Sequence, residues 1–145
     1  MTTSGTPMIG RDPIAIARRC FEDIMVKVDV AAADEILAPD VVFTTVNGDV
    51  LRGKREFQNF AVQLGEAFPD LRFDLQELFT DGERVAVRFV MRGTFQSTVM
   101  GLLPTGEEFA VTGIDTFRVQ DGKITEIHAS YDTLGQMQQL GVVKL

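Results

Sequence analysis

The dipeptide Asp121-Gly122 constrains the fold more than any other feature, because it separates two runs in which polar and apolar residues alternate. Both central residues of a type I′ turn need positive φ, which Asp and Gly tolerate better than most residues. The pattern therefore predicts a β-hairpin with a two-residue turn, in which Gln120 lies opposite Lys123. Because successive residues of a strand point to opposite faces, this register also predicts which side chains share a face.

The predicted register brings ionisable side chains together. Directly opposed residues have Cβ atoms roughly 4.5 to 5.5 Å apart, so we expect the Asp115 carboxylate to hydrogen-bond the His128 ring and to favour its protonated form. Asp132 lies about 13 Å further along the strand, too far to contact His128 directly. The pairs expected on one face are Phe117 with Glu126, Asp115 with His128, Gly113 with Ser130 and Val111 with Asp132.

Helical periodicity dominates the first half of the chain, and strand periodicity dominates the second half. Helices followed by a long antiparallel sheet predict an α+β fold, in which the N-terminal helices pack against one face of a curved sheet. A curved sheet closed on one side by helices has the shape of a cone, and the mouth of this cone is a natural small-molecule site. Residues 1–11 are expected to form a flexible tail and residues 12–145 a single domain. The expected helices follow Asp12-Pro13, Asp29 (through Ala38) and Gly53 (up to Pro69), and the expected strands are 41–45, 49–52, 71–79, 84–95, 109–119 and 123–134.

Composition excludes several function classes. The net charge of −7 and the lack of a clustered Lys/Arg footprint argue against a nucleic-acid partner. A single cysteine, Cys20, cannot form an intrachain disulfide, and neither a signal peptide nor a membrane-length apolar run is visible. We therefore expect a soluble, cytoplasmic protein that does not bind membranes. One His among dispersed carboxylates lacks the spacing of a metal site, so no metal is expected.

An ordered set of short motifs resembles the SnoaL-like polyketide cyclase family of the NTF2-like superfamily, over Ile14 to Gly141. The resemblance implies a cone-shaped α+β barrel, a homodimer, and cofactor-free enzymes that close a ring of polyketide esters by intramolecular aldol condensation. The family's catalytic aspartate is similar in position to Asp132. The motifs are Phe68-Pro69-Asp70, Arg92-Gly93-Thr94, Pro104-Thr105-Gly106, Asp121-Gly122-Lys123-Ile124 followed by Glu126, and Asp132 seven residues before Gln139-Leu140-Gly141.

A single carboxylate can perform the chemistry that this resemblance implies. It takes a proton from a carbon activated by carbonyl groups and later returns a proton to the new alkoxide, which requires a pKa raised toward neutrality by an apolar cone. We therefore expect Asp132 as acid/base, with Asp115 and His128 as a polar wall of the site. Asp132 could instead be the N-cap of a terminal helix, and His128 paired with Asp115 could be purely structural. The expected substrate-binding residues are Phe95, Phe117 and Ser130.

Three functions remain open from the sequence. The first is cyclase-like lyase or isomerase chemistry on an apolar or polyketide-like molecule. The second is a related hydroxylase, isomerase or hydrolase that uses the same cone, and the third is a noncatalytic ligand-binding or dimerisation module. We also expect a homodimer formed through sheet faces, because apolar Ala86 and Val90 share the predicted outer face with Arg88.

Overall fold

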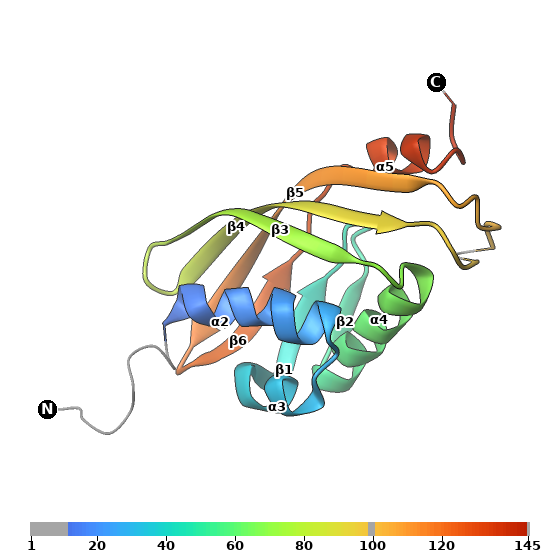
Figure 1. The fold of residues 1–145 in the computed structure, drawn as a ribbon. Coiled ribbons are helices and arrows are strands. Elements are labelled where there is room, and N and C mark those ends of the chain that lie inside the picture. The colour runs from blue at the N-terminus through green and yellow to red at the C-terminus, as the bar shows by residue number, and fades with distance from the viewer. Residues whose placement is uncertain (1–11, 99–100, 145) are drawn as a thin grey trace, which may run out of the picture.

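The structure, a computed structural model, describes residues 12–98 and 101–144, so the expected tail at 1–11 lies outside the described residues. Helices pack on the concave face of a curved six-stranded sheet that does not close (Figure 1), which confirms the predicted α+β architecture. None of the described helices is long and apolar enough to cross a bilayer. In chain order the elements are α2 (Pro13–Arg19), η1 (Cys20–Val26), α3 (Val30–Ile36), β1 (Leu37–Thr44), β2 (Val50–Arg52), α4 (Lys54–Ala67), β3 (Arg72–Thr80), β4 (Arg84–Thr94), β5 (Glu108–Gln120), β6 (Lys123–His128) and α5 (Thr133–Gln139).

The sheet has the strand order β2-β1-β6-β5-β4-β3. Its pairs are antiparallel except for β1 with β6, which run parallel. Along β4 every second residue from Val85 to Gly93 is buried, whereas the residues between them are more exposed, as expected for a strand with one face on the core. The sheet therefore has an inner face under the helices and an outer face away from them (Figure 1).

Local sequence signals place the helix starts where they were predicted. The Asp12 carboxylate accepts a hydrogen bond from the Ile14 N–H at 3.1 Å, and the Asp29 carboxylate accepts one from the Ala32 N–H at 3.2 Å. The second helix ends earlier than expected, at Ile36 rather than Ala38. Strand β1 starts directly afterwards, and its proline lies in the irregular stretch between Leu37 and Val42, where the ladder with β6 is interrupted.

The β5–β6 hairpin has the predicted turn but a different register further out. Asp121 and Gly122 both have positive φ, at 52° and 77°, and Gln120 pairs with Lys123. Beyond Val119 the register shifts by one residue, because Thr125 forms a β-bulge and has no partner of its own. The predicted pairing of every residue further from the turn is therefore wrong.

The bulge changes which face of the sheet the residues of β6 occupy. His128 pairs with Thr116 and not with Asp115, and Phe117 pairs with Ile127 and not with Glu126. A shift of one residue moves a side chain to the opposite face, so His128 lies on the outer face while Asp115 stays on the inner face. The strand also ends at His128, short of the expected 134, and Gly113 bridges Tyr131.

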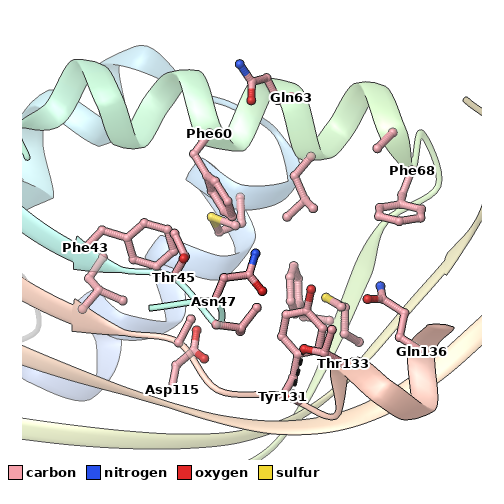
Figure 2. Close-up of a pocket in the computed structure, with 18 of the residues that line it drawn as sticks. Phe43, Thr45, Asn47, Phe60, Gln63, Phe68, Asp115, Tyr131, Thr133 and Gln136 are labelled. Atoms are coloured by element: carbon pink, nitrogen blue, oxygen red, sulfur yellow. Dashed lines mark hydrogen bonds between the residues drawn. The ribbon is translucent and has the colours of Figure 1, made fainter. Parts of the chain in front are cut away.

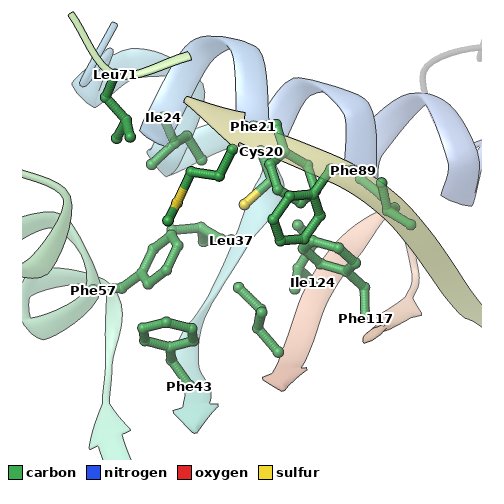
Figure 3. Packing of buried hydrophobic residues seen from close by; sticks show 14 of the residues in the cluster. Cys20, Phe21, Ile24, Leu37, Phe43, Phe57, Leu71, Phe89, Phe117 and Ile124 are labelled. Atoms are coloured by element: carbon green, nitrogen blue, oxygen red, sulfur yellow. The ribbon is translucent and has the colours of Figure 1, made fainter. Parts of the chain in front are cut away.

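A cluster of aromatic rings joins helix η1 to the inner face of the sheet. The ring centroid of Phe21 lies 5.1 Å from Phe73, 5.4 Å from Phe89 and 5.7 Å from Phe117, in edge-on or tilted arrangements that aromatic pairs prefer. Figure 3 shows Phe21, Phe89 and Phe117 gathered in the core. Phe21, Phe89 and Phe117 are nearly inaccessible to solvent, and Phe73 is partly buried against them. The cluster forms a packed floor for the space that remains between helices and sheet.

Candidate active site

A cavity of about 630 Å³ lies between the inner face of the sheet and helices η1, α4 and α5. This volume is in the range of small-molecule binding sites. Most of its wall is aromatic and aliphatic, and its polar groups are few (Figure 2). On the sheet side these include Asp115 and Tyr131. Elsewhere around the wall lie two further acids, two threonines and four amide side chains: Asp49, Glu56, Thr45, Thr133, Asn47, Asn59, Gln63 and Gln136.

Asp115 is the acidic group on the sheet side of this cavity. It lies on β5 opposite the fully buried Val87, and its carboxylate accepts a hydrogen bond from the Ser130 N–H at 3.2 Å. The residue lines the cavity. Burial raises the pKa of Asp115 to about 7, an effect that the Ser130 hydrogen bond opposes only in part. The group can therefore both accept and donate a proton near neutral pH.

Tyr131 and Cys20 are close enough to Asp115 to respond to its charge. Burial, and secondarily the charge of Asp115, raises the pKa of the Tyr131 phenol and that of the Cys20 thiol. Both groups consequently stay protonated at neutral pH, which makes the thiol unreactive as a nucleophile. The phenol is a hydrogen-bond donor, and no described residue hydrogen-bonds its hydroxyl group, so the hydroxyl can donate to a ligand in the cavity.

Gly113 allows Tyr131 to reach this position. A Cβ atom at Gly113 would lie 2.6 Å from the Phe89 ring, from the Ser130 carbonyl oxygen and from the Tyr131 Cβ. The chain after β6 therefore crosses β5 at the one position where no side chain intervenes, and the Ile114 N–H donates to the Ser130 carbonyl at 2.8 Å. This close crossing sets both Tyr131 and the Ser130 N–H beside Asp115.

The predicted substrate-binding residues divide into two groups. Phe95 and Phe117 are buried and line the cavity. The Ser130 side chain is exposed and does not line it, although its backbone N–H binds Asp115. His128 does not join them: its side chain is 60% exposed on the outer face, with Nε2 4.0 Å from Glu126 Oε1. The prediction that Asp115 and His128 pair as one polar wall of the site is therefore wrong, because the two side chains lie on opposite faces of the sheet.

Asp132 occupies the position that the capping alternative describes. Its carboxylate accepts a hydrogen bond from the Gly135 N–H at 2.8 Å and so caps α5. The residue is exposed, and its neighbours Tyr131 and Thr133 line the cavity while Asp132 does not. An acid/base role for Asp132 thus rests on the resemblance in sequence alone.

Sequence reasoning missed Tyr131 and Gln136, which both line the cavity. One signal was available for the first: Tyr131 is the only tyrosine in a chain with eleven phenylalanines, so its hydroxyl group was a candidate for a specific role. No comparable signal marked Gln136, because the sequence does not show which side of a short helix faces a cavity. Among the described residues, no three His, Cys, Asp or Glu side chains come together as metal ligands.

Comparison with known proteins gives a consistent result. The sequence pattern of one family, described as SnoaL-like polyketide cyclase, matches residues 15–140. IdmH from Streptomyces antibioticus, provisionally assigned as a polyketide cyclase, is 28% identical with a TM-score of 0.80 over 90% of this chain and 99% of its own. A SnoaL-like protein from Jannaschia, with the same provisional assignment, is 21% identical with a TM-score of 0.79 over 97% and 100% of the two chains. No curated protein matches the sequence significantly.

AclR from Streptomyces galilaeus is a structural relative with a different provisional assignment, as a hydroxylase. It is 21% identical to this chain, with a TM-score of 0.76 over 90% of this chain and 85% of its own. At this identity the likeness concerns the fold alone. Relatives with the same fold are thus named after different reactions, a cyclisation and a hydroxylation. The chemistry of this chain therefore has to be argued from its cavity.

Proposed function

The chain belongs to the SnoaL-like polyketide cyclase family, and from this premise we propose that it is an enzyme that uses Asp115 as acid/base on an activated carbon acid in a polyketide-like ester. As the family resemblance implies, the reaction is an intramolecular aldol closure without a cofactor. The observation that carries the proposal is the Asp115 carboxyl, held in an apolar cavity with a pKa of about 7.

Each step of the closure has a group in the cavity to perform it. Ionised Asp115 takes a proton from a carbon flanked by carbonyl groups, and the resulting enolate forms a carbon–carbon bond with a second carbonyl carbon of the same molecule. Protonated Asp115 then returns that proton to the alkoxide oxygen, so the product is an isomer of the substrate. Tyr131 can donate a hydrogen bond to the enolate oxygen and stabilise its charge.

The charge of the cavity wall supports a neutral substrate. No lysine or arginine among the described residues lines the cavity, whereas Asp49, Glu56 and Asp115 do. A free carboxylate in the substrate would meet these acids without a compensating cation, and burying an unpaired charge is costly. An ester of the same acid avoids this cost, which favours the esterified form as substrate.

Incubation with a neutral aromatic polyketide methyl ester tests the proposal. We expect a product of unchanged mass and altered absorbance, and a kcat/KM that rises with pH through an apparent pKa near 7 in the wild-type protein. A product heavier by one oxygen would favour the hydroxylase alternative, with which the name of AclR agrees. Binding without any product, across a panel of such esters, would contradict the enzymatic proposal.

We also propose that the protein is a homodimer formed through the outer face of the sheet. Ala86 and Val90 lie on this face, as predicted, and large apolar side chains are exposed beside them, with Phe79 58% and Ile114 48% accessible. Exposed apolar groups of this size on one sheet face favour association. Light scattering that gives the monomer mass at micromolar concentration would contradict the dimer.

A further inference from the structure

Gln136 is a buried amide that faces the cavity. It is only 4% exposed, yet among the described residues no group hydrogen-bonds its side chain. Figure 2 shows the amide directed from α5 into the space below α4, on the opposite side of the cavity from Asp115. The amide atoms of Gln136 are not fully enclosed, because they keep contact with the open cavity. A ligand that fills the cavity covers them, and an amide covered in this way without a hydrogen-bond partner is unfavourable.

The neighbouring Gln139 shows that helix α5 does not need this amide for its own anchoring. The Gln139 amide oxygen accepts a hydrogen bond from the Ala110 N–H at 2.7 Å, and its amide nitrogen donates to the Ala110 carbonyl at 3.1 Å. Asp132 caps the other end of the helix. Of the three glutamines on this short helix, Gln139 is hydrogen-bonded to backbone whereas Gln136 faces the cavity.

We infer that Gln136 is a specificity-determining residue that pairs with a ligand edge carrying a hydrogen-bond donor beside an acceptor. A primary carboxamide offers an acceptor oxygen and a donor nitrogen on one edge, so a cis lactam, a carboxamide or a hydroxyl next to a carbonyl can satisfy both. A ligand that lacks the donor leaves the amide oxygen buried and unpaired, which lowers affinity. The inference rests on the proposed function only in taking this cavity as the substrate site.

A pair of neutral aromatic probes tests this inference without turnover. Phenanthridin-6(5H)-one presents a lactam N–H beside a carbonyl, and its N-methyl derivative lacks that donor. In fluorescence titrations we expect the wild-type protein to bind the lactam about tenfold more tightly or better. In Gln136→Met, which preserves side-chain length, both probes should bind and the ratio of their dissociation constants should fall to about one.

A control variant separates this inference from its alternatives. Gln139→Met should keep the wild-type ratio but melt at a lower temperature, since it loses the two hydrogen bonds to Ala110. The titrations measure binding without turnover, so a failure of the acid/base proposal, which only turnover reveals, is read separately. Two results would overturn the inference. The first is a wild-type protein that binds both probes equally or binds neither. The second is a Gln136→Met protein that keeps the preference, since the N-methyl group would then merely clash; Gln136→Leu repeats the test if the Met variant does not fold.

Discussion

The two faces of one sheet hold their carboxylates in opposite ways. On the outer face, carboxylates lie against arginines in contact with solvent, and their charge is balanced. On the inner face Asp115 lies in an apolar cavity whose wall, as far as the structure describes it, contains no cation. The outer pairs are Arg88 with Glu77 and Arg92 with Asp74, each at 2.7 Å, and Arg118 with Glu83 and Glu126.

This difference shows why the number of acids in a sequence says little about function. An exposed ion pair contributes roughly 0 to 1 kcal/mol to stability, because solvent and salt screen its charges. A buried acid without a cation has its proton affinity raised by desolvation, and this places Asp115 where it can exchange protons near pH 7. The candidate catalytic group is therefore the buried acid that has no cationic partner among the described residues, and the following experiments test that contrast.

The largest expected effect is on turnover. Asp115→Asn keeps the size of the side chain but removes the ionisable group, so turnover should fall ~10²- to 10⁴-fold, as is usual for general acid/base groups. Asp132→Asn makes the same chemical change at an exposed helix cap, where Asn caps as well as Asp, and should leave turnover and melting temperature nearly unchanged. The opposite ranking of the two variants would return the acid/base role to Asp132.

The second effect is on the pH dependence of stability. The pKa of Asp115 is raised on folding, so the stability associated with its protonated form is present below pH 4 and is lost as the pH rises through about 7. The loss amounts to roughly 4 kcal/mol at most. Urea unfolding at pH 5 and pH 8 should show a smaller pH dependence in Asp115→Asn than in wild-type protein. Gly65→Ala, which changes no ionisable group, should keep the wild-type dependence, and equal behaviour of both variants would contradict the contrast.

The third effect concerns the close crossing that positions Tyr131. Gly113→Ala would place a methyl group 2.6 Å from three neighbouring groups, so we expect a loss of about 1 to 3 kcal/mol in unfolding free energy. Gly65→Ala in α4 is the matched control, because open space surrounds that position and Ala is favoured in helices by up to about 1 kcal/mol. Chemical denaturation of both variants gives the two values, and a neutral Gly113→Ala would mean that the crossing is loose.

The smallest effect is expected for His128. Its ring lies on the outer face and is largely exposed, so His128→Ala should change turnover by less than about twofold. Steady-state kinetics on the ester substrate measures this directly. A loss of tenfold or more would show that the outer face takes part in the reaction.

Local sequence signals predicted the fold well because each of them acts within a few residues. The caps at Asp12 and Asp29 and the turn at Asp121-Gly122 are all where they were expected. The site was predicted less well because its geometry depends on the pairing register of β5 with β6. One extra residue in β6, Thr125, changes this register. A signal of the bulge was present in the sequence, since positions 124 and 127 are both isoleucine although strict alternation puts residues three apart on opposite faces. In the structure both are buried.

The remaining site residues could not be predicted from local patterns. Tyr131 reaches the cavity only because Gly113, eighteen positions earlier in the chain, leaves room for it. Gln136 lines the cavity on a helix that the hydrogen bonds between Gln139 and Ala110 hold against β5. Both depend on contacts between distant segments, which a single sequence does not reveal.

The bulge at Thr125 also affects how this hairpin can change length during evolution. Because Thr125 has no partner across the ladder, a chain without it could form a regular two-residue hairpin in which Glu126, Ile127 and His128 keep their present partners. Insertions and deletions of one residue at this point are thus absorbed locally and do not exchange side chains between the cavity and the outer surface. Homologous positions beyond the turn are accordingly better matched by their side of the sheet than by counting residues from Asp121-Gly122.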